Sequence, residues 1–223
     1  MELRRVVLFF LIIFLPLFLL LQSVEFNTFD KELYIKSYER YGVLKSTNRS
    51  IGELDGITKL LLRYLREGLD KEVLRPFFSD REVKHMEDVK LLFKYGFMLK
   101  NISLILSIFG IVTIVYSKDY SYFAKGMFYG IFGWWGFFIL LFIVSTWDFT
   151  KYFTYFHLIF FDNDLWILNP DTDLLIQMLP EQFFIHIFRR IVLLFLGMLA
   201  IIQLIAYILM RKERDDDGGT MGY

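Results

Sequence analysis

Four apolar segments alternate with polar segments along the chain, at residues 1–24, 101–117, 126–147 and 191–210. Their lengths lie near the roughly 17–25 residues that an α-helix needs to cross the hydrocarbon core of a bilayer. The pattern of hydrophobic positions therefore predicts four transmembrane helices.

The polar segments between them differ in size. A large insert, 25–100, follows the first apolar segment, and a short turn, 118–125, follows the second. The segment 148–190 is too polar to cross a bilayer and too apolar for a free loop, as is typical of backbone at a membrane interface or around a cavity. Residues 211–223 form a C-terminal tail.

Local signals predict that the insert is mostly helical. Leu54, Ile57 and Leu61 recur at helical spacing. Ser79 and Glu82 match the capping box, in which a serine and a glutamate three residues later satisfy backbone N–H groups at a helix start. We therefore expect a helix that begins near Ser79 and continues into the second crossing.

Basic residues predict the orientation of the chain. Arg4 and Arg5 precede the first crossing, and the cluster at 211–214 follows the fourth. Because positive residues collect on the cytoplasmic side, both termini are expected in the cytoplasm and the segments 25–100 and 148–190 outside the cell. A cleavable signal peptide would share the basic start, but the apolar run is long and no small-residue cleavage site follows it, which favours an uncleaved anchor.

The expected fold is thus an all-α membrane protein with four transmembrane helices. A mostly helical extracellular insert follows the first helix, and an amphipathic interfacial segment lies between the third and fourth. The composition agrees, since 56% of the 223 residues are hydrophobic and 26 are Phe. With 25 basic and 25 acidic residues, the chain has no net charge that would indicate a nucleic-acid partner. The absence of cysteine excludes disulfides and a Cys nucleophile.

Two histidines are candidates for proton transfer at the outer face. His85 lies near the start of the expected second helix with Asp88 on the same helical face, and His157 follows the third crossing among aromatic residues. The two imidazoles could meet at the outer interface, where one would serve as a general base. The alternative is that His85 is a solvated helix residue and His157 an interfacial aromatic.

Other kinds of site find little support. The chain has no nucleophile elbow, no P-loop and no H-E-x-x-H motif, and no cofactor is expected. His85, Asp88, His157 and Asp162 could together bind zinc, but their spacing is not diagnostic of a metal site.

Arg189 and Arg190 stand at the outer entrance of the fourth crossing. Their side chains either extend to the membrane interface or contact a lipid headgroup or a substrate carbonyl.

Two motifs carry a family resemblance. FFSDREVKHMEDVKLLF at 77–93 and FHLIFFDNDLWILNPDTDLLIQMLPEQFF at 156–184 resemble the bacterial Lit family, the lipoprotein intramolecular transacylases. The four crossings, the large outer insert and the short length also fit, so the resemblance covers nearly the whole chain. It implies that His85 and His157 are the catalytic pair. Among the other matching positions, Asp88, Asn163 and Trp166 are candidates for substrate binding, together with Arg189 and Arg190.

The resemblance also implies a reaction. The sn-2 acyl chain of a diacylglyceryl-modified bacterial lipoprotein moves to the α-amino group of the same N-terminal cysteine, which gives the N-acyl lyso form. The expected location is the bacterial cytoplasmic membrane, among membrane lipids, with the active site at the outer leaflet. Since amine and ester belong to one substrate molecule, no covalent acyl-enzyme is required. We expect His85 to act as the base and His157 to orient it or donate a proton, although these roles could be exchanged.

Two other functions remain as alternatives. One is a metal-dependent membrane hydrolase that uses His85, Asp88, His157 and Asp162. The other is a non-enzymatic membrane scaffold that binds lipoproteins through the outer insert.

Overall fold

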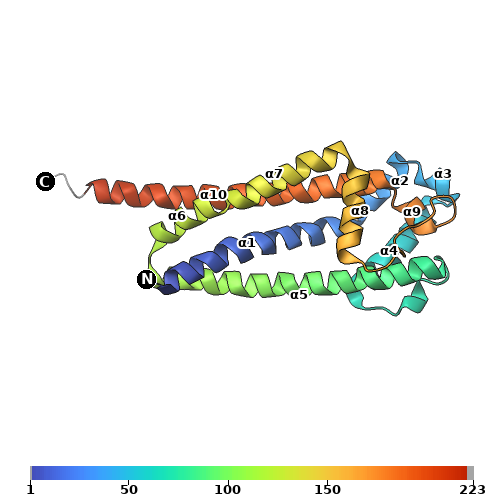
Figure 1. Ribbon diagram of the computed structural model, residues 1–223, viewed down its shortest axis with the longest axis horizontal. Helices are drawn as coiled ribbons and strands as arrows, with labels where there is room; N and C mark the ends of the chain where they lie inside the picture. The colour runs from blue at the N-terminus through green and yellow to red at the C-terminus, as the bar shows by residue number, and fades with distance from the viewer. Residues whose placement is uncertain (1, 220–223) are drawn as a thin grey trace. The chain divides into compact units, whose positions relative to one another are not determined.

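The computed structural model describes residues 2–219, and all regular structure within that range is helical (Figure 1). The helices, in chain order, are α1 (Glu2–Thr28), α2 (Lys31–Arg40), α3 (Val43–Thr47), α4 (Ile51–Glu67), the 3₁₀-helix η1 (Lys71–Val73), α5 (Asp80–Ser117), α6 (Tyr120–Gly130), α7 (Phe132–Trp147), α8 (Phe149–Phe160), α9 (Leu174–Met178) and α10 (Glu181–Gly219).

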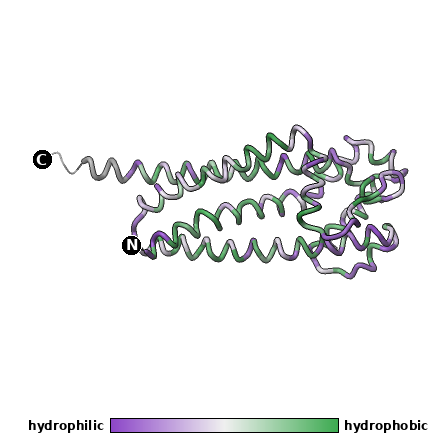
Figure 2. Tube along the Cα trace, viewed as in Figure 1, coloured by the Kyte–Doolittle hydropathy of each residue, from purple (hydrophilic) through white to green (hydrophobic). Residues whose placement is uncertain are grey.

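Four long helical stretches confirm the predicted number of membrane crossings. Glu2–Thr28, Asp80–Ser117, Tyr120–Ser145 and Glu181–Lys212 are long and apolar enough to span a bilayer. Hydrophobic colouring runs along much of α1, α5 and α10 in Figure 2. Large apolar side chains on these helices are exposed, as expected of surfaces that face lipid; they include Ile105, Phe109, Leu193 and Ile201.

Two of the crossing helices, α5 and α10, extend beyond the apolar segments that predicted them. α5 begins in the predicted insert, and α10 begins at Glu181, before the expected fourth crossing at 191. The segment 148–190 contains α8 and α9 joined by a loop. Within the predicted tail, α10 continues to Gly219, and residues 220–223 lie outside the described part of the chain.

The chain divides into two compact units. The first comprises Met1–Ser23, Met98–Ile143 and Ile191–Tyr223, and the second comprises Val24–Phe97 and Val144–Arg190. All four apolar segments lie wholly or mostly in the first unit, whereas most of the insert and the whole of the segment 148–190 lie in the second.

In the first unit, Pro16 creates a hydrogen-bonding site within α1. Proline has no N–H, so the carbonyl of Ile12, four residues earlier, loses its helical partner. The indole Nε1 of Trp134 donates to that carbonyl at 2.9 Å. A neighbouring indole, that of Trp135, donates to Gln203 Oε1 at 2.8 Å. The two tryptophans therefore join α7 to α1 and α10 by hydrogen bonds, which the bilayer interior leaves without competition from water.

Glycines let α1 and α6 approach closely in the same unit. A Cβ atom on Gly126 would lie 2.3 Å from Leu8 Cδ2, and one on Gly130 would lie 2.4 Å from Ile12 Cδ1. Any larger residue would collide there, so these positions act like the small-residue contacts of other membrane helices.

The second unit has a core of its own. α2 packs against α3 and α4, and α3 packs against α9. Tyr38 is fully buried, and its hydroxyl lies 2.6 Å from Thr58 Oγ1. The predicted periodicity of α4 is confirmed, since Leu54, Ile57 and Leu61 are all buried.

The start of α5 shows the predicted capping box. Glu82 Oε2 accepts from the backbone N–H of Ser79 at 2.7 Å, and Ser79 Oγ accepts from the N–H of Glu82 at 3.4 Å. This cap sets the point at which α5 begins and thereby the direction of the side chains on its first turns.

Candidate active site

The first turns of α5 and the end of α8, both in the second unit, bring two histidines together. The ring centroids of His85 and His157 lie 6.1 Å apart, with an angle of 34° between the ring planes. Each side chain is 7% exposed. The structure thus places together the two histidines that the sequence singled out. Both are largely buried, which does not fit the alternative that His85 is a solvated helix residue.

Aromatic side chains surround His157. Trp166 stacks on the imidazole at a centroid distance of 4.7 Å and an angle of 26°. Phe153 meets it edge-on at 4.4 Å, and Phe161 contacts both imidazoles, at 5.3 Å from His85 and 5.6 Å from His157. These rings exclude water from the imidazole and fix its orientation.

A backbone carbonyl determines which nitrogen of His157 carries the proton. His157 Nδ1 lies 2.7 Å from the carbonyl oxygen of Phe153, one helical turn earlier in α8. A carbonyl oxygen can only accept, so Nδ1 must donate. In neutral His157 the lone pair is therefore on Nε2, which is free to accept a proton.

His85 has a different environment. Its Nδ1 is buried and has no hydrogen-bond partner in the described part of the protein. The residue lies in the charged first turns of α5, before the apolar part that crosses the membrane. Burial is the largest cause of a lowered pKa for this imidazole, and the proximity of His157 acts in the same direction while Asp88 partly opposes it, so the pKa falls from 6.5 to about 4.

Burial also lowers the pKa of His157, while the hydrogen bond to Phe153 acts in the opposite direction. Both imidazoles are consequently neutral near pH 7. The pair can accept a proton and donate hydrogen bonds without placing a permanent positive charge among the aromatic rings.

Asp88 and Asn163 meet across the site. Asn163 Nδ2 donates to Asp88 Oδ2 at 2.9 Å. The same asparagine accepts from the backbone N–H of Leu165 and, through its own carbonyl, from Trp166 Nε1 at 2.9 Å. Asp88 therefore holds the turn that places Trp166 over His157, which gives three of the predicted site residues a shared structural role.

Two further contacts between α5 and the 161–175 region were not anticipated from the sequence. Arg81 donates to the carbonyl of Asp164 and pairs with its carboxylate at 3.4 Å. Glu82 Oε1 accepts from the backbone N–H of Leu175 at 2.6 Å. The sequence offered one signal for the Arg81 contact. Arg81 and Asp88 precede and follow His85 in the sequence, and because they are seven residues apart they share a helix face.

The two arginines of the fourth crossing differ. Arg190 Nε donates to Asn27 Oδ1 at 2.9 Å, and its Nη2 pairs with Asp30 Oδ2 at 3.0 Å. Its guanidinium is therefore engaged in joining α10 to the end of α1. Arg189 is exposed, which leaves its charge accessible to a headgroup.

The geometry offers no support for a metal site. Among residues 2–219, no group of three or more His, Asp or Glu side chains is placed to hold a metal ion. Asp162, which a zinc site would require, is exposed. The arrangement instead suits proton transfer by neutral imidazoles in a partly dehydrated setting.

A family model and solved structures of known proteins indicate the same family for this chain. The family model described as lipoprotein intramolecular transacylase Lit matches residues 9–184. The in meso structure of the membrane integral lipoprotein intramolecular transacylase Lit from Bacillus cereus is similar with a TM-score of 0.82 and 21% identity, over 96% of this chain and 98% of that one. A structure of that protein with a histidine-to-arginine mutation gives 0.79 and 21% identity, over 96% and 95% of the two chains. No curated protein sequence matches.

Proposed function

Since the chain belongs to the Lit family of lipoprotein intramolecular transacylases, we propose that it moves the sn-2 acyl chain of a diacylglyceryl-cysteine to the α-amino group of the same cysteine. The substrate is then a diacylglyceryl-modified bacterial lipoprotein, and the product is its N-acyl lyso form. No cofactor takes part. The observation that carries the proposal is the pair of buried, neutral histidines contributed by α5 and α8.

The reaction needs one proton to be moved. The amine nitrogen attacks the ester carbonyl carbon, the carbonyl becomes an oxyanion, and the bond from that carbon to the glyceryl oxygen then breaks. The amine loses a proton and the glyceryl oxygen gains one. A single imidazole can accept the first proton and deliver it to the second site.

The contacts of His157 favour it for this transfer. Its Nδ1 donates to the carbonyl of Phe153, which leaves Nε2 as the acceptor and makes that nitrogen more basic. The sequence-based hypothesis gave the base role to His85, and we propose that the two roles are exchanged. The burial of His85 and its low pKa suit a neutral ring that donates a hydrogen bond to the oxyanion.

The remaining residues shape the site. Trp166 and Phe161 exclude water, which protects the ester from hydrolysis. Asp88 and Asn163 hold Trp166 in place, and Arg189 is available to a substrate carbonyl or headgroup. Arg190 contributes by joining α10 to the end of α1.

Mass spectrometry of a reporter lipoprotein tests the function. A host that lacks this activity should produce the N-acyl lyso form once the wild-type chain is expressed. The purified protein should retain the activity after chelator treatment, because no metal is involved. A reporter that keeps a free α-amino group would contradict transacylation, and loss of activity that only zinc restores would favour the hydrolase alternative.

We propose that both termini are cytoplasmic and that the histidines act at the outer leaflet. Arg4, Arg5 and the cluster at 211–214 support this orientation by the positive-inside rule. A reporter enzyme that is active only in the cytoplasm should give a signal when it is fused to the C-terminus. A reporter that is active only outside the cytoplasmic membrane should give none at the same position. The opposite result would overturn the topology.

The two histidines should titrate below the ordinary value. A lowered pKa means that the neutral ring persists to lower pH, so both imidazoles should remain neutral as the pH falls through 6.5, and His85 should gain its proton only near pH 4. NMR of histidine-labelled protein can follow this, with His85→Gln and His157→Gln to assign the signals. Titration of either residue at or above 6.5 would contradict the buried geometry.

A further inference from the structure

A pocket lies on the face of α5 that points away from His85. It has a volume of about 710 Å³ and is lined by α4, the segment around η1, and the α5 residues from Glu87 to Phe97. At about 100° per residue, helical geometry places Lys94 on the opposite side of α5 from His85. The lining contains none of the residues assigned to the reaction.

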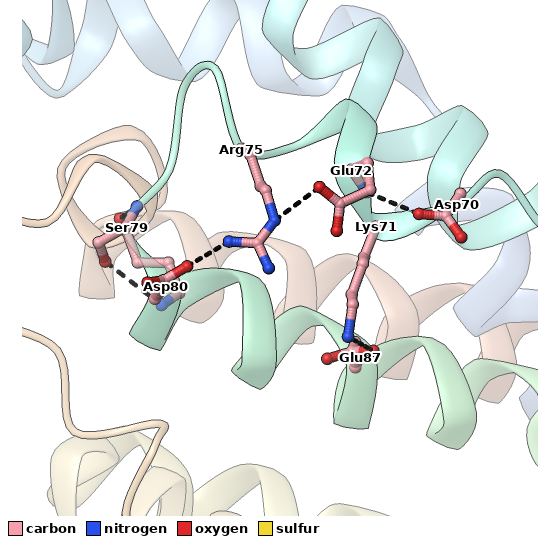
Figure 3. A network of polar contacts seen from close by, with 8 residues as sticks. Asp70, Lys71, Glu72, Arg75, Ser79, Asp80 and Glu87 are labelled. Carbon is pink, nitrogen blue, oxygen red and sulfur yellow. Dashed lines mark hydrogen bonds and ion pairs between the residues drawn. The ribbon is translucent and has the colours of Figure 1, made fainter.

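One wall of this pocket is held by ion pairs. Lys71 of η1 pairs with Glu87 of α5 at 2.9 Å, as Figure 3 shows. Arg75 joins the same segment to α5 by pairing with Glu72 and Asp80 (Figure 3). These contacts keep the wall in place and leave the charges of Lys71 and Glu87 neutralised.

The other charges do not balance. Arg66, also in the lining, pairs with Glu25, which lies outside it. Lys90 and Lys94 then face one remaining carboxylate, that of Asp70, which accepts a hydrogen bond from the backbone N–H of Glu72.

Neither lysine forms an ion pair with an acidic side chain in the described part of the protein. The ammonium of Lys90 donates to the carbonyl of Leu69 and lies 4.2 Å from the centre of the Tyr64 ring. Lys94 is exposed and forms no ion pair among the described residues. Two lysines four residues apart on a helix repel each other, and an anion between them would remove that cost.

The rest of the lining is apolar. Leu65, Leu69 and Leu91 contribute to it, and Leu91 is 48% exposed. Lys94 lies close to the point at which α5 becomes continuously apolar. The pocket therefore combines positive charge with a hydrophobic surface next to a membrane-spanning segment, which is the combination that binds an anionic lipid.

We infer that this pocket binds an anionic phospholipid, with Lys90 and Lys94 on the headgroup phosphate and an acyl chain against Leu91. The transfer reaction needs no second substrate, because its amine and ester belong to one molecule. The bound lipid is therefore not consumed but holds α4 and the η1 segment against α5. The binding of lipid at this pocket does not depend on the proposed function, whereas the statement that the lipid is not consumed rests on it.

Native mass spectrometry of the detergent-purified protein tests it, with phosphatidylglycerol as the probe. Lys94→Gln removes one charge and no contact within the fold, and should raise the Kd for phosphatidylglycerol about tenfold, the loss expected for one charge-assisted hydrogen bond. Lys84→Gln is the matched control, since Lys84 is also exposed on α5 and lies outside the lining. It should bind as the wild type does.

Three results would overturn the inference. Equal affinity of the wild type and Lys94→Gln would mean that Lys94 makes no contact with lipid. Equal binding of phosphatidylcholine would remove the role of net negative charge. Displacement of the lipid by millimolar inorganic phosphate would indicate a site for free anions. Transacylation in lipid-free detergent should be the same for Lys94→Gln and the wild type, so a failure here is distinct from a failure of the proposed function.

Discussion

Replacing His157 with alanine should reduce the rate of acyl transfer by about 10²–10⁴-fold, the usual contribution of a positioned general base. The reason is that Nε2 of His157 has the free lone pair, while Nδ1 is committed to the carbonyl of Phe153. The measurement is single-turnover conversion of a diacylglyceryl lipopeptide to its N-acyl lyso form, followed by mass spectrometry. Binding of the lipopeptide should change little, because the proposed role of the ring is proton transfer and not substrate binding.

Two comparison variants make the assignment specific. His85→Ala should cost about 10²–10³-fold, the range for loss of one oxyanion donor. Asn163→Ala breaks the hydrogen bond to Asp88 and leaves both imidazoles in place, so its cost should be about tenfold or less. If the asparagine variant lost as much activity as His157→Ala, or if His157→Ala kept activity within a few-fold of the wild type, the proton-transfer role would be refuted.

The pH dependence separates the two histidine roles further. If His157 is the base, the acid limb of the rate should survive in His85→Ala and disappear in His157→Ala. If the original hypothesis for His85 is right, the pattern is reversed. This comparison uses residual rates, so it does not require the variants to be fully active.

The four crossings were predictable because membrane insertion depends on properties that a linear pattern displays directly. A run of about 20 apolar residues satisfies its backbone by forming a helix, whatever the rest of the chain does. The capping box at Ser79 was predictable for a similar reason, since both partners lie within one turn. Such features depend on near neighbours in the sequence.

The contacts that build the site depend on distant residues. Asp88 and Asn163 were each singled out, but nothing in the sequence indicated that they hydrogen-bond to each other. The role of the Phe153 carbonyl was also hidden, because a backbone oxygen has no residue identity to recognise. Pairing across 75 residues follows from how α5 and the 161–173 loop pack, which periodicity does not specify.

Glu82 is the clearest example of a local signal with an additional long-range role. One carboxylate oxygen completes the capping box with Ser79, and the other accepts from the N–H of Leu175 at the start of α9. The side chain is only 2% exposed. A single buried carboxyl group thus satisfies N–H groups at two helix starts and joins α5 to α9, the helix that follows the loop with Asn163 and Trp166.

Replacing Glu82 with alanine should therefore be strongly destabilising. It leaves the buried N–H of Leu175 without an acceptor, which costs about 1–3 kcal/mol. It also removes the cap on the N–H of Ser79, an exposed residue, which costs about 0.5–2 kcal/mol, so the expected loss in the free energy of unfolding is about 2–5 kcal/mol. Glu82→Gln keeps the shape and one oxygen, and should lose about half as much. Thermal unfolding of the detergent-solubilised protein, followed by circular dichroism, gives the order of stability of the variants.

The chain contains a matched control for this effect. Ser50 and Glu53 form the same capping box at the start of α4, but this one is exposed, and the second oxygen of Glu53 pairs with Arg49 at 4.0 Å instead of accepting from a buried backbone N–H. Water can replace the lost acceptor there, so Glu53→Ala should lower the unfolding midpoint far less than Glu82→Ala. Equal shifts in the two variants would show that Glu82 acts as a helix cap alone. A much larger shift for Glu82 would show that the hydrogen bond to α9 and the burial of the carboxyl group hold α9, and with it the end of the active-site loop, against α5.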